Sequence, residues 1–413
     1  MESLRSVIAA MMPGQFLASL DIKDAYLHVP IFPPHQRFLH FALQNFHYQF
    51  TAIPFGLTSA PAFLPKSWRR PQQCSGNTGI SITPYLDDLL IKAPSLAEAQ
   101  QSLQSSMATL QDLGWCINLT KSSLIPNQSM VFLRMQFDTQ TQRVSLPYTK
   151  ALHLQSLVRS LLSKPRHTVG FCMRVLGVMV STIEAVPFAQ YHLRELQWNI
   201  LSAWKQKSLH QEIRLTHQAR VSWWLRSDRL LTGKPLGENS WRLLTTDASL
   251  SGWGAVLENH PAQGQWSPEE RTLLINILEI RAIRLGLFTW QHELKGQAVK
   301  VQTDNSTAVA YINHQGGTRS RMALNEVRRI FQWAENNQTH LSAIYIPGLQ
   351  NWEADFLSRQ VLDPGEWSLK DDIFHEITLK WGIPEVDLMA TRQNRKVPNS
   401  PGTGILWRWR PTL

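Results

Sequence analysis

The feature that most constrains this chain is a pair of adjacent acids inside an apolar hairpin. The segment 80–91 places Tyr85-Leu86-Asp87-Asp88 between two short apolar runs, so that Asp87 and Asp88 fall at the tip of two predicted strands. Adjacent carboxylates among apolar residues are costly unless a cation neutralises them. The pattern therefore suits a divalent metal site, although an exposed turn is the better explanation of these four residues when they are taken alone.

A metal site of this kind needs a further carboxylate from another strand. The segment 16–22 is typical of an apolar strand and contains Asp21 near its end, which makes Asp21 the candidate third ligand. Two metal ions held about 3.5–4 Å apart by such carboxylates can activate an attacking hydroxyl and stabilise a leaving pyrophosphate.

Four more acids lie beside predicted core segments in the second half of the chain. Taken singly, three of them are explained as strand-end turns or a helix cap, but Glu279 lies on an otherwise apolar helical face and needs a partner. Together they can converge at one edge of a sheet and hold two Mg²⁺ ions, one to activate water and one to stabilise a leaving oxygen. The four acids are Asp247, Glu279, Asp304 and Asp355.

The spacing of apolar residues divides the chain into regions. Up to about residue 140 it predicts strands, among them 48–53, and a helix over 95–113 with Ser95 as its N-cap. Residues 145–237 have mostly helical spacing, and from about 362 the chain is expected to be irregular, with five basic and no acidic residues after position 390. Between these regions we expect strands at 241–246, 254–257 and 298–303 and a helix at 271–288.

Composition excludes several classes of protein. The formal charge of +10 suits a polyanionic partner such as nucleic acid, although an ordinary basic protein is an equal alternative on charge alone. Three cysteines without CxxC spacing argue against a disulfide framework or a cysteine zinc site. The sequence has neither a long apolar run nor a signal peptide at its start. We therefore expect an intracellular protein, cytoplasmic or nuclear, without a membrane partner.

Five motifs of the first region stand in a fixed order, at 19–30, 53–61, 85–88, 113–122 and 132–135. In sequence and order they resemble the palm of a reverse transcriptase over residues 3–140, most closely that of DIRS-type retrotransposons. The resemblance implies a primer–template and dNTPs as substrates. It implies metal ligands at Asp21, Asp87 and Asp88, a steric gate at Tyr26, nucleotide and template contacts at Phe55 and Gly56, and a proton donor to pyrophosphate at Lys121. Without it, Tyr26 is equally well a core aromatic residue and Lys121 a surface lysine.

The second set of acids, in the order Asp, Glu, Asp, Asp, resembles the RNase H fold of retroelements over residues 240–360. The resemblance implies that Asp247, Glu279, Asp304 and Asp355 bind metal and that the substrate is an RNA–DNA hybrid. The loop 347–350 lacks the histidine of many members, so slower product release is expected. Residues 152–237 resemble the thumb and connection, whose basic side chains would contact a duplex backbone, or form a simple helical spacer.

Three departures from the reverse transcriptase pattern weaken the polymerase prediction. The fingers region that the family has upstream is not in the sequence given. Arg134 occupies a primer-grip position where glycine is usual, and we expect it to disturb the tight turn. Residues 64–78, with Pro65, Pro71 and Gly76, replace an amphipathic helix. Residues 64–69 can be written with codons that encode Thr-Lys-Val-Leu-Ala when they are read one frame away, so our hypothesis is that residues 64 to about 78 are an out-of-frame stretch in a decayed element.

The sequence thus predicts a multidomain α+β or α/β protein. We expect a truncated palm at 1–140, a helical thumb and connection at 141–240, an RNase H-like mixed sheet with helices at 241–360, and a partly disordered extension at 361–413. The predicted function is two-metal phosphoryl transfer with Mg²⁺, or Mn²⁺ in its place, with cleavage of hybrid RNA favoured over polymerisation. The alternatives are a catalytically inactive nucleic-acid-binding remnant and a host protein that has recruited the module.

Overall fold

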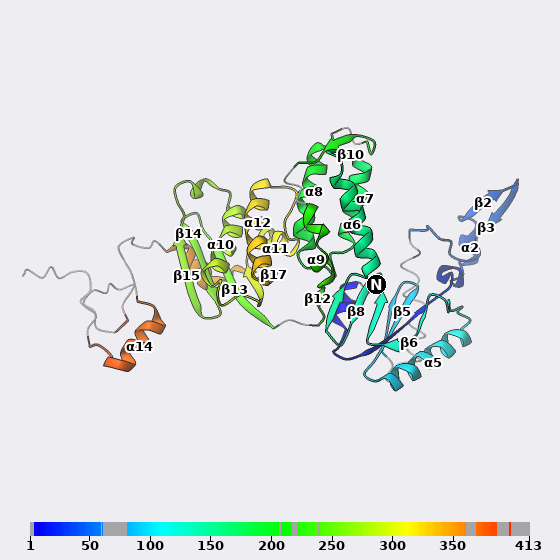
Figure 1. Cartoon of the computed structure of the whole chain (residues 1–413), viewed down its shortest axis with the longest axis horizontal. Helices are drawn as coiled ribbons and strands as arrows, with labels where there is room; N and C mark the ends of the chain where they lie inside the picture. Colours follow the sequence, from blue (N-terminus) through cyan, green and yellow to red (C-terminus); the bar gives the residue numbers. More distant parts are fainter. Residues whose placement is uncertain are drawn as a thin grey trace, which may run out of the picture. The chain divides into compact units, whose positions relative to one another are not determined.

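The computed structural model describes residues 4–58, 60, 81–205, 208–216, 221–237, 240–360, 369–385 and 396–397. Its contacts divide the chain into two compact units. The first comprises 1–240 with 314–324 and 331–335, and the second comprises 241–313, 325–330 and 336–413 (Figure 1). Among the described residues, the helices are too short or too polar to cross a membrane.

A four-stranded sheet in the order β4-β5-β1-β6 organises the start of the first unit. As predicted, an apolar strand ends at Asp21, and an apolar hairpin carries Asp87 and Asp88. Helix α5 packs on this sheet, and its N-cap Ser95 accepts a hydrogen bond from the Glu98 amide, as the sequence predicted. The bounds are β1 Phe16–Asp21, β4 Ser81–Tyr85, β5 Asp88–Ala93, β6 Ser123–Asn127 and α5 Leu96–Asp112.

A two-stranded hairpin follows β1 along the chain. Of the strand expected at 48–53, only residues 48 and 49 lie in a strand, β3 (Phe46–Gln49), which pairs with β2 (His40–Leu43). It begins earlier because Gln44 and Asn45 both adopt positive φ and close a tight turn directly before it. The short helices of this region are α1 Leu4–Ala9, η1 Ala25–His28 and α2 Pro33–Gln36.

The turn at Arg134 forms without disruption, contrary to expectation. Strands β7 (Ser129–Phe132) and β8 (Met135–Asp138) pair directly across it, with Phe132 opposite Met135. Leu133 and Arg134 both lie in the left-handed region, at φ 49° and 60°. The turn is therefore retained with two side chains in a conformation that costs roughly 1–2 kcal/mol per non-glycine residue. This hairpin belongs to a second sheet, β12-β9-β8-β7, with β9 Arg143–Ser145 and β12 Lys234–Pro235.

Over its described residues the stretch 145–237 is mostly helical, as predicted, but short strands at 166–168, 212–214 and 234–235 interrupt it. Its helices bury Leu154, Val158, Val175 and Met179, which share one core with Trp224. The elements are α6 Tyr148–Leu162, β10 Arg166–Thr168, α7 Val169–Val180, α8 Ala189–Ala203, β11 Glu212–Arg214, η4 Val221–Leu225 and α9 Ser227–Leu231.

The second unit is built on a five-stranded mixed sheet in the order β15-β14-β13-β16-β17. Strands β15, β14 and β13 are antiparallel neighbours, whereas β13, β16 and β17 are parallel. All three predicted strands of this region are observed. The bounds are β13 Trp241–Ala248, β14 Gly252–Leu257, β15 His260–Gln265, β16 Ala298–Thr303 and β17 His340–Tyr345.

Helices cover both faces of this sheet. Neighbouring residues of β14 point to opposite faces of the sheet. On the face of Ala255 lies α10 (Ile275–Thr289), where a Cβ added to Gly286 would be 3.1 Å from the Ala255 Cβ. On the face of Gly254 lies α13 (Trp352–Arg359), where a Cβ added to Gly254 would be 2.3 Å from the carbonyl oxygen of Ala354. Glycine at 254 therefore permits close docking of α13. The remaining elements are η5 Glu270–Thr272, α11 Ser306–Asn313, α12 Arg321–Asn336 and η6 Gly348–Gln350.

Two expectations about helices need correction. The helix predicted at 271–288 begins only at Ile275, because the separate turn η5 precedes it and Leu274 is extended. The stretch from 362, expected to be irregular, contains helix α14 (Asp371–Trp381). The apolar residues of α14, at 373, 374, 377 and 381, have helical spacing. Acids occupy the first turn of this helix, and Gly382, at φ 85°, follows its last residue. The predicted aberrant segment 64–78 lies outside the described residues.

Candidate metal centres

The first candidate centre lies where β1 meets the β4–β5 hairpin. The strand register pairs Asp21 with Asp88 across β1 and β5, and Tyr85 with Asp88 across β4 and β5. The Ile22 amide donates to the carbonyl oxygen of Asp87 at 3.0 Å, which fixes the hairpin tip beside the end of β1. The structure therefore brings Asp21 together with two acids that are far from it in sequence, as the sequence predicted.

The charges at this centre oppose one another. Burial is the first cause that raises the pKa of Asp88, to about 6, and the neighbouring carboxylates of Asp87 and Asp21 raise it further. The ammonium group of Lys121 acts in the opposite direction. Lys121 follows a turn that is fixed to β1, because the Asn118 amide donates to the Asp21 carbonyl oxygen at 2.8 Å. A cation at this position would relieve the repulsion among the three acids.

Two aromatic rings lie close to this acidic cluster. Tyr26, on the turn η1 directly after β1, meets Phe55 edge to face with 5.5 Å between ring centroids. Burial and the charge of Asp87 raise the pKa of Tyr26. Phe55 is 62% exposed, and Gly56 follows it at φ 90°. The charge of Asp87 therefore reaches Tyr26, and the exposed ring of Phe55 packs against that tyrosine.

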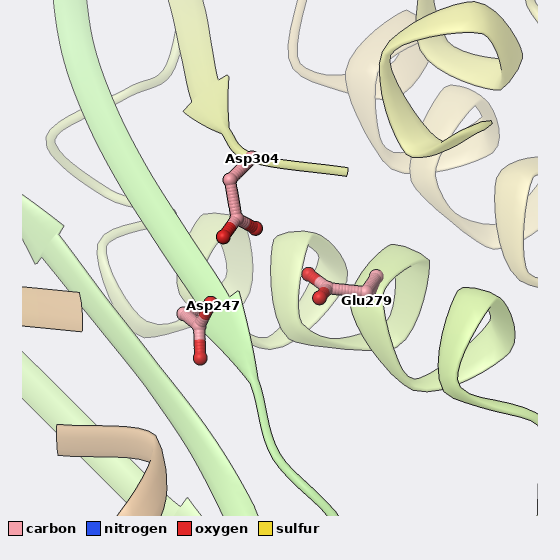
Figure 2. A group of neighbouring side chains, drawn as sticks. All are labelled: Asp247, Glu279 and Asp304. Atoms are coloured by element: carbon pink, nitrogen blue, oxygen red, sulfur yellow. The ribbon is translucent and has the colours of Figure 1, made fainter. Parts of the chain in front are cut away.

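The second candidate centre is more compact. Asp247 comes from β13, Glu279 from α10, and Asp304 follows β16. Figure 2 shows their carboxylates directed into one shared space. One ligand oxygen from each lies within 4.8 Å of the others, a spacing that a single metal ion can bridge. Within the described part of the chain, Asp21, Asp87 and Asp88 do not meet this spacing.

Burial makes this second centre electrostatically costly. Asp247 and Glu279 are only 4% and 5% exposed. Burial, followed by the charges of Asp247 and Asp304, raises the pKa of Glu279 to about 9, and burial raises that of Asp247 to about 6. The buried Oε2 of Glu279 has no hydrogen-bond partner among the described residues. An orphaned carboxylate oxygen facing two further acids matches the oxygen ligands that Mg²⁺ prefers.

The fourth predicted acid is placed differently. Asp355 lies on α13, as expected, but its Oδ1 accepts from Arg359 Nε at 2.8 Å and Nη2 at 2.6 Å. It is not part of the close group, although its charge contributes to the raised pKa of Asp247. The loop without histidine, η6, lies beside Asp304, since a Cβ on Gly348 would be 3.4 Å from the Asp304 Oδ2.

Two residues that the sequence analysis did not single out contact Asp247. Asn351 Nδ2 donates to Asp247 Oδ1 at 3.1 Å, and Ser358 Oγ donates to Oδ2 at 2.7 Å. Both are fully buried. Asn351 directly precedes α13 and Ser358 lies within it. Their spacing of seven residues, about two helical turns, is the signal that could have identified them.

Comparison with known proteins shows what the chain is similar to. Residues 1–137 match the sequence profile of the family described as "Reverse transcriptase (RNA-dependent DNA polymerase)". The structure is similar to foamy viral protease-reverse transcriptase, solved once in complex with an RNA/DNA hybrid and once with double-stranded DNA. The TM-score is 0.50 and the identity 16% in both cases, over 88% of this chain and 48% and 60% of the solved chains. The chain thus has the multidomain α+β fold of a reverse transcriptase.

Curated relatives extend the similarity beyond residue 137. The chain is 23% identical to the enzymatic polyprotein of Carnation etched ring virus, over 84% of this chain and 51% of the polyprotein. It is 22% identical to the Pol polyprotein of transposon gypsy from Drosophila melanogaster, over 94% of this chain and 37% of that protein. It is therefore similar to retroelement polyproteins, and it spans about half or less of the length of these relatives.

Proposed function

We propose that this chain is the reverse transcriptase and ribonuclease H portion of a DIRS-type retroelement polyprotein, and that its second unit hydrolyses the RNA strand of RNA–DNA hybrids. The convergence of Asp247, Glu279 and Asp304 carries this proposal. Their spacing, burial and raised pKa values describe a site that is poorly stable without a cation and well suited to one.

The side chains of this centre have separate tasks in the proposed reaction. Asp247, Glu279 and Asp304 would hold Mg²⁺, or Mn²⁺ in its place, and Asp355 would be the fourth ligand. Such ions would supply activation of water and stabilisation of the leaving 3′-oxygen. Burial of Asp247 and Glu279 excludes competing solvent from the ligands, and the partly exposed Asp304 and Asp355 leave an open side toward the nucleic acid.

The first unit retains the parts of a polymerase site. In the proposal, Asp21, Asp87 and Asp88 bind metal, and the ring of Tyr26 excludes the ribose 2′-hydroxyl so that dNTPs are preferred. Phe55 and Gly56 line the nucleotide and template, and Lys121 supplies a proton to the pyrophosphate. The edge-to-face contact of Tyr26 with Phe55 and the nearby Asp87 support these roles.

Ribonuclease activity is the favoured activity for a geometric reason. The acids of the second unit lie within single-ion distance of one another, whereas those of the first unit do not. The proposed partners are an RNA–DNA hybrid and a primer–template, consistent with the charge of +10. Foamy viral protease-reverse transcriptase, which has this fold, was solved with nucleic acids of these kinds.

A hybrid-cleavage assay tests the proposal. The full chain is incubated with an end-labelled RNA–DNA hybrid in Mg²⁺ or in EDTA. We expect cleavage in Mg²⁺ only, reduced at least about 100-fold by Asp247→Asn or Asp304→Asn. Glu293→Gln, which removes an exposed acid of the same unit, serves as the matched control and should cleave normally. Hybrid binding without any cleavage would support the inactive nucleic-acid-binding remnant instead.

A further inference from the structure

The Asp247 carboxylate is held on both oxygens by one helix. Asn351 Nδ2 lies 3.1 Å from Oδ1, and Ser358 Oγ lies 2.7 Å from Oδ2. Both donors are 0% exposed, so water cannot replace either one at low cost. Hydrogen bonds to an ionised carboxylate are roughly twice as strong as those between neutral groups.

The two donors are themselves fixed. Asn351 Nδ2 also lies 3.3 Å from the Thr246 carbonyl oxygen, and Ser249 Oγ donates to the Ser358 carbonyl oxygen at 2.6 Å. The close approach of α13 to Gly254 sets the depth of the helix on the sheet. The clamp around Asp247 is therefore rigid before any ligand arrives, a condition that favours precise ligand geometry.

The hydroxyl of Ser358 has one proton and two nearby acceptors. Its Oγ lies 2.7 Å from Asp247 Oδ2 and 2.9 Å from the carbonyl oxygen of Asp355. The charged carboxylate is the stronger acceptor, so the proton goes to Asp247 while that residue is ionised. This hydrogen bond therefore fixes the orientation of the Oδ2 side of the Asp247 carboxylate.

We infer that Ser358 and Asn351 are positioning residues that orient Asp247 for the cation shared with Glu279 and Asp304. The inference rests on the metal centre proposed above. With both donors in place, Asp247 needs no side-chain reorientation when the ion binds. Asp355 also lies on α13, the helix that carries Ser358 and begins directly after Asn351. This one helix therefore orients Asp247 and also supplies Asp355. Loss of such a supporting partner typically weakens metal binding 10–100-fold.

Direct measurement of metal affinity tests this inference without relying on activity. Mn²⁺ binding to the full chain is followed by electron paramagnetic resonance in an Asp87→Asn/Asp88→Asn background, which removes the first acidic centre. We expect Ser358→Ala and Asn351→Ala each to weaken Mn²⁺ binding at least about 10-fold. Thr339→Val removes another buried hydroxyl of this unit, one that bonds to the Leu294 carbonyl oxygen, and should bind like the parent.

Each result has a defined meaning. Unchanged Mn²⁺ affinity in a folded Ser358→Ala or Asn351→Ala protein would overturn the inference, and unfolding of both variants would reduce the two residues to a structural role. If the parent binds no Mn²⁺, the metal centre and the inference both fail. If the parent binds Mn²⁺ and the variants bind it weakly, but no hybrid is cleaved, only the proposed function fails. In an active parent, kcat should fall while KM for the hybrid stays within about twofold.

Discussion

Asp21 and Asp88 lie directly opposite each other across the antiparallel strands β1 and β5. Like charges in this position are destabilising. Burial first, and then the charges of Asp87 and Asp21, raise the pKa of Asp88 to about 6. Two acids that face each other across a strand pair lower the stability of the fold. A metal centre without its ion has the same property, because no cation neutralises its acids.

The first prediction concerns this repulsion. Because the pKa of Asp88 is higher in the folded than in the unfolded chain, stability is lost as pH rises from about 4 to about 6. Asp88→Asn removes this loss, so at pH 8 without metal we expect a melting temperature higher by about 1–2 °C. Asp112→Asn, at an exposed acid of α5, is the matched control. Equal melting temperatures of wild type and Asp88→Asn at pH 8 would contradict the argument.

The second prediction concerns Glu279, whose pKa is raised to about 9. Its protonated form is favoured on folding, so its contribution to stability is full below about pH 4.5 and declines as pH rises toward 9. Glu279→Gln keeps the shape without the titration and should stabilise the metal-free chain at pH 8 by about 1–3 kcal/mol.

Chemical denaturation at pH 5 and pH 8, with and without Mg²⁺, measures this difference. Mg²⁺ should restore wild-type stability at pH 8 and leave Glu279→Gln largely unaffected. A wild-type stability that rises between pH 5 and pH 8 without metal, with no such rise in Glu279→Gln, would refute the assignment.

The third prediction concerns the turn of the β7–β8 hairpin. Arg134 adopts φ 60°, a conformation that glycine reaches at little cost. Arg134→Gly should therefore raise stability by about 1 kcal/mol, measured by denaturant unfolding. Arg134→Ala separates backbone from charge, since it retains the strained conformation but removes the Arg134 charge, which after burial is the second cause that lowers the pKa of Lys150. Equal stabilisation by alanine would show that charge, not backbone strain, is responsible.

The fourth prediction concerns the ion pair between Arg359 and Asp355. Arg359 is 67% exposed and Asp355 38%, and exposed pairs four residues apart on a helix contribute only about 0.3–0.5 kcal/mol. The pair is therefore too weak to withhold Asp355 from a bound cation. We expect Arg359→Gln to change the Mg²⁺ concentration for half-maximal cleavage by less than about threefold. A tenfold change would show that Arg359 regulates the site.

Sequence reasoning succeeded where a local rule fixes the structure. The hairpin around Asp87 and Asp88, the Ser95 cap and the strand before Asp304 follow from apolar spacing and capping chemistry. The convergence of Asp247, Glu279 and Asp304 also followed, because each acid adjoins a core segment.

Other features depend on contacts that no local pattern specifies. Ser358 and Asn351 reach Asp247 only because α13 docks closely over Gly254. The pairing of Asp355 with Arg359 depends on the rotamers of the two side chains, which the sequence pattern does not specify. Helix α14 was missed although its apolar spacing is helical, because the basic composition of the chain beyond it dominated the interpretation.

Anomalous diffraction from crystals containing Mn²⁺ tests the central claim most directly. The account predicts an anomalous peak within bonding distance of carboxylate oxygens of Asp247, Glu279 and Asp304, and the loss of that peak in Asp304→Asn crystals. A chain saturated with Mn²⁺ that shows no peak among these three residues would contradict it.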